Sequence, residues 1–312
     1  MASSLGLVLK LGAVGAYVSS GVYVHLRGRV RHDLVRQLAD HSTVLAPYNS
    51  LAYLFSAVPR DAVLDPILLP ELAPLREHWQ TIRDEAVSLL DAGRIRPSEK
   101  YSDIAFNSFF RRGWKRFYLK WYGPVLPSAA AHCPETVRLV QSIPSINAAL
   151  FAVLPPGGKL GEHRDPFAGS LRYHLGLVTP NSPSCRIYVD GDQLHWRDGE
   201  PLLFDETYVH SAVNESDVTR IILFCDVTRP MRTRVMRALN AWVARRIVPL
   251  TASRNEADEP LGAVNGIARY IYALKGFFHR IKKRTDLRLY YGIKYGGTAI
   301  LVWLVLFSGL VF

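Results

Sequence analysis

The sequence predicts an all-β core, a sandwich or barrel that includes the jelly roll among its forms. From residue 146 onward, short apolar or alternating runs follow one another, from INAALFAVL to TRIILFCDV. Turn-forming stretches such as PPGG, TPNSPS and NESD separate these runs. Closely spaced short strands joined by such turns are typical of β-sandwiches and barrels. We therefore expect the chemistry of this chain to lie on a β scaffold.

The residues before this core read as mostly helical. LREHWQTIRDEAVSLLDAG has helical periodicity and ends at a glycine, while APYNS and LDPILLPELAPL interrupt the pattern with prolines. Hydrophobic residues make up 49% of the 312-residue chain, so it can bury a sizeable core. Cys133, Cys185 and Cys225 form no CxxC pair, and we expect reduced thiols that pack in the core.

Two terminal segments are expected to cross a membrane as helices, one at each end of the chain. The first is Leu5–Leu26, and the second is Tyr295–Phe312, which is barely long enough. Basic residues follow the first segment and precede the second, so both flanks are expected on the cytoplasmic side. A buried core helix is the alternative for either segment.

The net charge of +11 points to an anionic partner. The segment PMRTRVMRALNAWVARRIVPL has apolar residues at helical spacing and arginines largely off that stripe. Such a helix can lie on anionic headgroups, or it can be an ordinary surface helix. We find no nucleic-acid-binding motif, so a membrane is the expected partner and nucleic acid is not.

The expected organisation is a membrane anchor with its basic flank (1–30), a mostly helical region (31–145), the catalytic β core (146–230), basic amphipathic helices (231–294) and the C-terminal transmembrane segment (295–312).

Ionisable residues are concentrated in GEHRDPFAGSLRYHLGL. Residues two apart on a strand point to the same side, so His163 pairs with Asp165, and Arg172 pairs with His174. With His210, which lies at the start of a later predicted strand, the first pair can supply the two-histidine, one-carboxylate set of non-haem Fe(II). A satisfied polar pair at a strand end is the alternative.

Arg220 stands in the otherwise apolar run TRIILFCDV. A guanidinium in a core strand is costly unless it is paired, and a dicarboxylate co-substrate would supply the partner. Exposure at the strand start is the alternative for this residue.

The stretches HRDPFAGSLRYHLGLV, GEPLLFDETYVHSAVNES and TRIILFCDVTRP resemble the aspartyl/asparaginyl β-hydroxylase superfamily, and within it the bacterial lipid A 2-hydroxylases. The resemblance covers roughly residues 100 to 230. It implies a double-stranded β-helix (jelly-roll, cupin-like) fold and hydroxylation dependent on Fe(II), 2-oxoglutarate and O2.

The resemblance also implies roles for single residues. His163 and His210 match the iron-binding histidines, and Asp165 falls where lipid A hydroxylases have a carboxylate and animal peptidyl hydroxylases have glycine. Arg172 and His174 match the pair at the C1 carboxylate of 2-oxoglutarate, and Arg220 matches the residue that binds its distal carboxylate. The chain departs from some relatives at Ala152, where they have a serine that helps to hold the co-substrate.

The expected function is hydroxylation of the 2-position of a lipid A acyl chain, a lipopolysaccharide modification, at the bacterial inner membrane with the catalytic domain facing the cytoplasm. A peptidyl aspartyl/asparaginyl hydroxylase is one alternative, and a non-enzymatic membrane-bound binding or scaffold protein is another. The sequence leaves open which lipid or acyl chain is modified and the oligomeric state.

Overall fold

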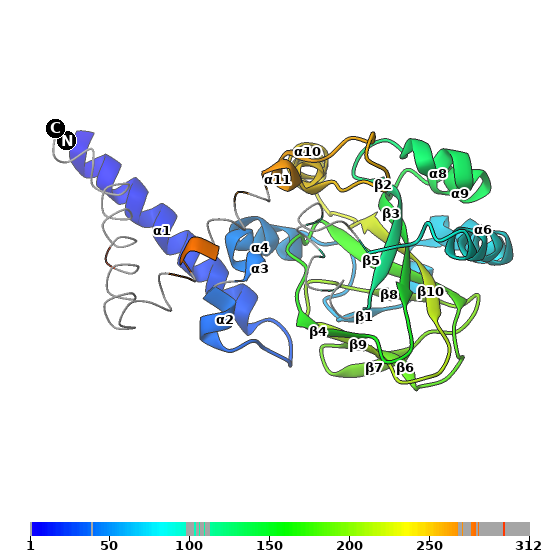
Figure 1. The fold of residues 1–312 in the computed structure, drawn as a ribbon. Helices are drawn as coiled ribbons and strands as arrows, with labels where there is room; N and C mark the ends of the chain where they lie inside the picture. The colour runs from blue at the N-terminus through cyan, green and yellow to red at the C-terminus, as the bar shows by residue number, and fades with distance from the viewer. Residues whose placement is uncertain are drawn as a thin grey trace.

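The computed structural model describes residues 2–38, 40–97, 103, 106, 109, 113–267, 270, 276–278, 280 and 296. Within them, two antiparallel β-sheets share one hydrophobic core and helices pack around the larger sheet (Figure 1). This is the cupin-like β-sandwich that the strand pattern and the family resemblance predict.

The larger sheet has the strand order β1-β8-β5-β10-β3-β2, and the smaller sheet has the order β4-β9-β6-β7. Apart from the pairs β2–β3 and β6–β7, neighbouring strands are not consecutive in the sequence, so residues far apart in the chain meet on one face. The strands are β1 (Val63–Leu64), β2 (Lys115–Trp121), β3 (Ile146–Leu154), β4 (Lys159–His163), β5 (Ser170–Val178), β6 (Cys185–Val189), β7 (Asp192–His195), β8 (Pro201–Phe204), β9 (His210–Asn214) and β10 (Arg220–Thr228).

Helices precede and follow this β core, and α6 packs on β5. Strands β1 and β2 arise from the region expected to be mostly helical and join the edges of the larger sheet. The helices are α1 (Ala2–Leu26), α2 (Leu34–Leu38), α3 (His41–Val44), α4 (Ala46–Leu54), α5 (Ala73–Glu77), α6 (Trp79–Asp91), α8 (Pro127–His132), α9 (Pro134–Ser142), α10 (Arg234–Arg246) and α11 (Ala263–Gly266), with 3-10 turns η1 (Pro66–Leu68), η2 (Pro70–Leu72) and η3 (Val248–Thr251).

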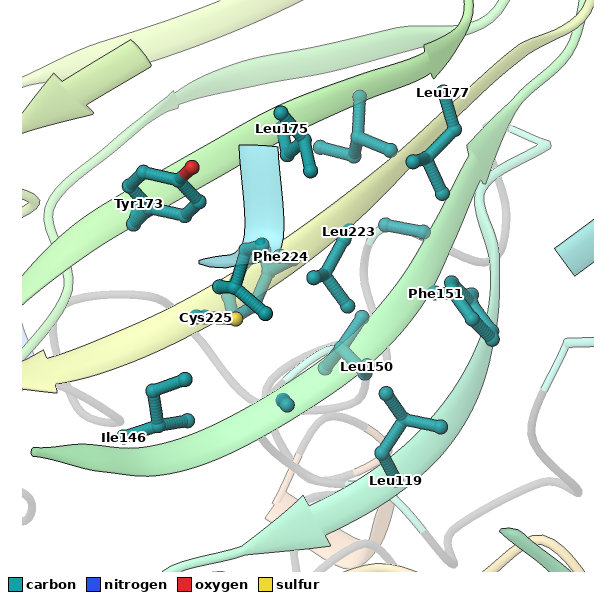
Figure 2. Close-up of a cluster of buried hydrophobic side chains, with 14 of the residues drawn as sticks. Leu119, Ile146, Leu150, Phe151, Tyr173, Leu175, Leu177, Leu223, Phe224 and Cys225 are labelled. Atoms are coloured by element: carbon teal, nitrogen blue, oxygen red, sulfur yellow. The ribbon is translucent and has the colours of Figure 1, made fainter. Parts of the chain in front are cut away.

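The alternation of side chains along β5 and β10 separates packing from chemistry. Tyr173, Leu175 and Leu177 of β5 lie with Leu223 and Cys225 of β10 in a buried apolar cluster (Figure 2). The residues between them in the sequence necessarily point to the opposite side of the sheet. That side faces the smaller sheet, and it is where the ionisable residues of both strands gather.

The expected N-terminal membrane span is wrong for the described residues, since none of their helices combines the length and apolar character needed to cross a bilayer. Lys10, serines and glycines interrupt the apolar run of α1. The C-terminal part of α1 packs against protein instead. Val24 is 1% exposed, and the Tyr23 ring lies edge-on to Tyr53 with 6.1 Å between centroids.

The C-terminal segment 295–312 lies outside the described residues except for Gly296. The basic segment at 231 onward forms α10, which packs on α4 through the cluster that contains Met231 and Met236. The domain boundaries expected from the sequence stay a prediction.

Candidate active site

Strand pairing brings two distant histidines together. His163 ends β4, His210 begins β9, and the two residues are direct partners in the antiparallel ladder. Their ring centroids lie 4.1 Å apart. The i, i+2 pattern alone could not give this register, which depends on how the two strands pair.

Backbone carbonyls fix which nitrogen of each ring faces the site. The Nδ1 of His163 lies 2.7 Å from the Gly161 carbonyl, and the Nδ1 of His210 lies 2.9 Å from the Tyr208 carbonyl. A ring that donates from Nδ1 keeps an unprotonated Nε2, which is the form that binds metals. Burial lowers the pKa of His163 and lowers that of His210 to about 3, so both rings are neutral near pH 7.

Asp165 completes the group from the loop that follows β4. Its backbone N–H donates to the Glu206 carbonyl at 3.0 Å, and its Oδ1 lies 3.8 Å from the His163 Nε2. Burial by itself raises the pKa of Asp165, but Arg172 and the two imidazoles outweigh burial and lower it. One ligand atom from each of His163, Asp165 and His210 lies within 4.8 Å of the others. Two neutral imidazoles and one carboxylate at this spacing fit a divalent metal ion.

Arg172 holds the Asp165 carboxylate in place. Its Nη2 lies 2.7 Å from the Asp165 Oδ2 and also contacts Glu206, while its Nε donates to Asp226 Oδ1 at 2.8 Å. Its guanidinium carbon lies 3.7 Å from the centroid of the Phe224 ring. The guanidinium is thus shared among three carboxylates, whereas the sequence suggested a direct contact with a co-substrate. That contact stays a prediction.

A closed hydrogen-bond network supports this arginine. The Tyr122 hydroxyl donates to Asp226 at 3.0 Å, and the Ser170 hydroxyl donates to Glu206 at 2.6 Å. Burial raises the pKa of both Glu206 and Asp226, with the neighbouring carboxylates adding to the rise and Arg172 opposing it. The network joins the metal-binding carboxylate to strands β5 and β10, so its position is set by the larger sheet.

The acidic pair before His210, Asp205 and Glu206, is buried. Asp205 is 1% exposed and pairs with Arg27 at 2.6 Å and with Arg229 at 2.8 Å. Burial by itself would raise the pKa of Asp205, but the two arginines outweigh burial and lower that pKa. Neither Asp205 nor Glu206 accepts from the His210 ring, whose Nδ1 faces a carbonyl. Asp205 instead links the end of α1 to the β core through its ion pair with Arg27.

A pocket of about 460 Å³, measured with its open mouth, lies between the two sheets beside these residues. Aromatic and aliphatic side chains form much of its wall, and the ionisable residues lie among them. The lining residues are Phe106, Phe109, Trp114, Leu160, His163, Asp165, Arg172, His174, Ile187, Trp196, His210, Ser211, Ala212, Arg220 and Phe224.

Arg220 is a buried cation that pairs with no carboxylate of the residues the structure describes. It is 1% exposed, and its guanidinium carbon stacks 4.4 Å from the centroid of the Trp196 ring. No carboxylate among the described residues pairs with it, and its Nε has no hydrogen-bond acceptor there. Burial lowers its pKa from 12.5 to about 10. A buried guanidinium facing a pocket is costly unless an anion enters, so the site is suited to a carboxylate ligand.

His174 offers a second unused donor in the same pocket. The Trp196 indole N–H donates to the His174 Nδ1 at 3.3 Å, which leaves the proton on Nε2. That Nε2 is buried and finds no partner in the described part of the chain. Burial and the nearby arginines Arg172 and Arg220 lower the pKa of His174 well below its usual value, so the ring is neutral.

A glycine lets the loop that carries Trp196 approach β5. A Cβ on Gly176 would lie 2.0 Å from the Arg197 carbonyl oxygen, and the Gly176 carbonyl accepts from the Gly199 N–H at 2.9 Å. Only glycine fits this approach, which seats Trp196 under Arg220.

The structure brings all six sequence-predicted residues to one pocket: His163, Asp165, Arg172, His174, His210 and Arg220. Sequence reasoning missed Asp226, Glu206 and Trp196. Asp226 could have been predicted from the sequence, because it is a charged residue in the same apolar strand as Arg220. Ala152, where some relatives have serine, is a buried residue of β3 paired with Ile222.

Comparison with known proteins identifies the family of this chain. The model of the family described as aspartyl/asparaginyl beta-hydroxylase matches residues 76–230. An ornithine lipid ester-linked acyl 2-hydroxylase of Rhizobium tropici is 33% identical over 198 residues, which cover 61% of this chain and 69% of that protein.

Human relatives match over shorter parts of their length. Aspartate beta-hydroxylase domain-containing protein 2 is 35% identical, covering 38% of this chain and 34% of the relative. Human aspartyl/asparaginyl beta-hydroxylase is 27% identical, covering 52% of this chain and 22% of the relative. Among solved structures, a Pseudomonas putida prolyl-4-hydroxylase is similar with a TM-score of 0.33 at 17% identity, covering 50% of this chain and 88% of that one. On the sequence matches, this chain belongs to the aspartyl/asparaginyl β-hydroxylase family of hydroxylases.

Proposed function

We propose that the protein is an Fe(II)- and 2-oxoglutarate-dependent dioxygenase that hydroxylates the 2-position of an acyl chain on a membrane lipid. One observation carries the proposal. The same pocket holds a metal-binding group of two neutral histidines and a carboxylate, and a buried arginine that lacks an anionic partner among the described residues. Iron alone would explain the metal-binding group but not the buried Arg220. Iron together with a dicarboxylate co-substrate explains both.

His163, Asp165 and His210 would hold the metal. Three protein ligands on one side of an octahedral ion leave open positions for a chelating co-substrate and dioxygen. Bound iron would supply the oxidative chemistry that removes CO2 from 2-oxoglutarate and inserts one oxygen atom into a C–H bond. The protein's own contribution is orientation: carbonyls fix the two rings, and Arg172 fixes the carboxylate.

Arg220 would bind the distal carboxylate of 2-oxoglutarate. Its guanidinium presents paired N–H donors, which match a carboxylate in geometry and charge. The His174 Nε2–H is the second donor we assign to the co-substrate, because it is buried and unused. We assign Arg172 a different task, namely to orient Asp165, because three carboxylates already share its guanidinium.

An acyl chain is the substrate that the remaining pocket wall favours. Phe109 lies against the metal-binding group, with its ring centroid 4.7 Å from that of His163, and Leu160 and Ile187 are also in the wall. Such a surface excludes water and offers apolar contact to a C–H bond that must lie near the metal. The relative named for acyl 2-hydroxylation of ornithine lipid supports the same class.

We propose lipid A and ornithine lipid as the two substrates to be tested, at the cytoplasmic leaflet of the bacterial inner membrane. Both carry acyl chains with a 2-position. Lipids would be extracted from a host that lacks both modifications after expression of the wild type or of His210→Ala, and examined by mass spectrometry. We expect a lipid one oxygen atom heavier with the wild type alone, and tandem fragmentation that places the hydroxyl on carbon 2. An unchanged lipid profile contradicts the proposal.

Peptidyl hydroxylation is the second candidate, and the 27% identity to human aspartyl/asparaginyl beta-hydroxylase favours it. The two candidates give different products in the same cells. Hydroxylated aspartate or asparagine in a co-expressed protein, together with unchanged lipids, would select the peptidyl reaction.

A further inference from the structure

The short helix α2 exposes an apolar face. Leu34, Val35 and Leu38 are 67%, 79% and 78% exposed. Leu38 lies four residues after Leu34 and three after Val35, so the three side chains lie on one side of the helix. Leaving three large aliphatic side chains in water forgoes the stabilisation that their burial would bring, so this face is suited to contact with another apolar phase.

Neighbouring helices also expose apolar side chains. Val44 of α3 is 68% exposed, and Val22 and Leu26 of α1 are 51% and 50% exposed. The three helices are joined: the Tyr17 hydroxyl of α1 donates to the Thr43 carbonyl of α3 at 3.0 Å, and α2 contacts α3. In Figure 1 these helices lie together at one end of the molecule, on the other side of the sheets from α6, α8 and α9. We call the exposed side chains of Leu34, Val35, Leu38, Val44, Val22 and Leu26 the apolar helix surface.

Hydrogen bonds join the segments that carry this surface to the residues beside the metal-binding group. Arg164, which lies between the ligands His163 and Asp165, donates to the Val24 carbonyl at 2.5 Å and to the Arg27 carbonyl at 3.0 Å. The guanidinium of Arg36 in α2 donates to the carbonyl of Glu162, the residue before His163. The exposed helices and the segment that carries His163 and Asp165 are therefore held next to each other.

The charges around the surface favour an anionic partner. Arg31 and Arg36 are exposed beside the apolar side chains of α2. Two nearby acids keep their negative charge: Asp33 accepts from the Arg36 N–H at 2.9 Å and Asp40 caps α3 by accepting from the Ser42 N–H at 2.9 Å, so the excess of positive charge comes from α10.

A second set of cations lies on α10, which packs against α4. Exposed arginines accompany exposed apolar residues on this helix, including Val235 at 77% and Trp242 at 55%. Mixed aliphatic, tryptophan and arginine side chains are the composition of helices that rest in the headgroup region of a bilayer. The exposed arginines of α10 are Arg234, Arg237, Arg245 and Arg246, and Arg232 is exposed just before the helix.

We propose that the apolar helix surface docks on the face of an anionic phospholipid bilayer, with α2 entering the headgroup region and the helices lying on the membrane. The choice of a bilayer over a protein partner rests on the proposed function, because an acyl-lipid substrate must be delivered to the pocket mouth. Docking by α2 would hold the metal-binding segment at the membrane face, from which a lipid can reach the pocket.

The test measures vesicle binding by the full-length, metal-free protein, so it does not depend on catalysis. Co-sedimentation is compared for vesicles rich in phosphatidylglycerol and vesicles of phosphatidylcholine alone. The disrupted variant carries Leu34→Ser, Val35→Ser and Leu38→Ser. The matched control is Ile67→Ser, which removes a side chain that is 76% exposed but lies in η1, outside the surface. Circular dichroism and thermal melting check that both variants fold.

We expect the wild type and Ile67→Ser to bind anionic vesicles alike, with weaker binding to neutral vesicles and to anionic vesicles in high salt. Since each aliphatic side chain contributes about a tenfold factor or more when buried, the triple variant should bind at least about 100-fold more weakly. Unchanged vesicle binding by the folded triple variant overturns the proposal. The proposal is also overturned if the wild type does not bind vesicles but forms a dimer, and the triple variant is monomeric.

Failure of the docking proposal and failure of the proposed function look different. A wild type that hydroxylates detergent-dispersed lipid without binding vesicles contradicts only the docking surface. A wild type that binds vesicles through α2 but hydroxylates no lipid contradicts only the substrate assignment.

Discussion

Replacing Arg220 with methionine should stabilise the ligand-free protein and remove its response to 2-oxoglutarate. Burial lowers the pKa of this guanidinium from 12.5 to about 10. At 1.36 kcal/mol per pKa unit, holding the charge in the pocket costs on the order of 3 kcal/mol. Because the pKa is lower in the folded state, the full cost applies below the folded value and disappears only as the pH rises past the unfolded value.

Methionine removes this cost and keeps most of the side-chain volume. The variant loses the stacking of the cation on Trp196, at 4.4 Å, which is worth roughly 0.5 to 2 kcal/mol. We therefore expect a net gain of about 1 to 3 kcal/mol in the free energy of unfolding near neutral pH, measured by urea denaturation. With a redox-inert divalent metal and 2-oxoglutarate at about 100 times its Kd, the wild type should gain a further ~2.7 kcal/mol. The variant should gain none of that increment.

A buried arginine that has its carboxylate serves as the control. Arg116 is 3% exposed and its Nε lies 3.2 Å from Asp103. Arg116→Met leaves that buried acid without its cation and should lose about 3 to 5 kcal/mol. The reasoning about Arg220 is refuted if Arg220→Met is destabilised by more than about 1 kcal/mol, or if 2-oxoglutarate stabilises it as much as the wild type.

Three further predictions follow from the site and its supports. His210→Ala should weaken Co(II) binding by at least about 100-fold in calorimetric titration, because one of three ligands is lost; wild-type affinity would show that the metal lies elsewhere. Asp226→Asn should weaken metal binding about 10- to 100-fold with an unchanged circular dichroism spectrum, since it anchors the arginine that orients Asp165; unaltered affinity would remove the orienting role. Gly176→Ala should lower the free energy of unfolding by about 1 to 3 kcal/mol, because its Cβ would lie 2.0 Å from a backbone oxygen; a neutral result in urea denaturation would mean that the loop can move aside.

The sequence was sufficient for the β scaffold and the six residues in the pocket. Alternation along a strand put Arg172 and His174 on one side, and the structure shows both at the pocket while Tyr173 and Leu175 pack in the apolar cluster (Figure 2). Local periodicity carries this information because a strand has only two faces. The same reasoning made a buried Arg220 one of two alternatives, and the structure selects it.

Local sequence patterns could not predict contacts between distant strands. Register puts Asp226 of β10 directly opposite Arg172 on β5, and the loop before β9 adds Glu206, which no local pattern indicated. Two strands must be paired before such a network can be seen. A single sequence fixes neither their order nor their register.

The N-terminal helix was misread for a different reason. A run of apolar residues signals the need for apolar surroundings but does not say whether protein or lipid provides them. Tyr23 and Val24 meet α4 and the core, while Val22 and Leu26 remain exposed on the same helix. The side chains around a helix decide this, and they come from elsewhere in the chain.

The most direct test of the central claim is turnover of the purified protein under isotope-labelled dioxygen, with both products quantified together. The account predicts that Fe(II) and 2-oxoglutarate yield succinate and hydroxylated lipid in equal amounts, each with one labelled oxygen atom, and that His210→Ala yields neither. Hydroxylated lipid formed without succinate, or unlabelled hydroxyl groups, would contradict the account.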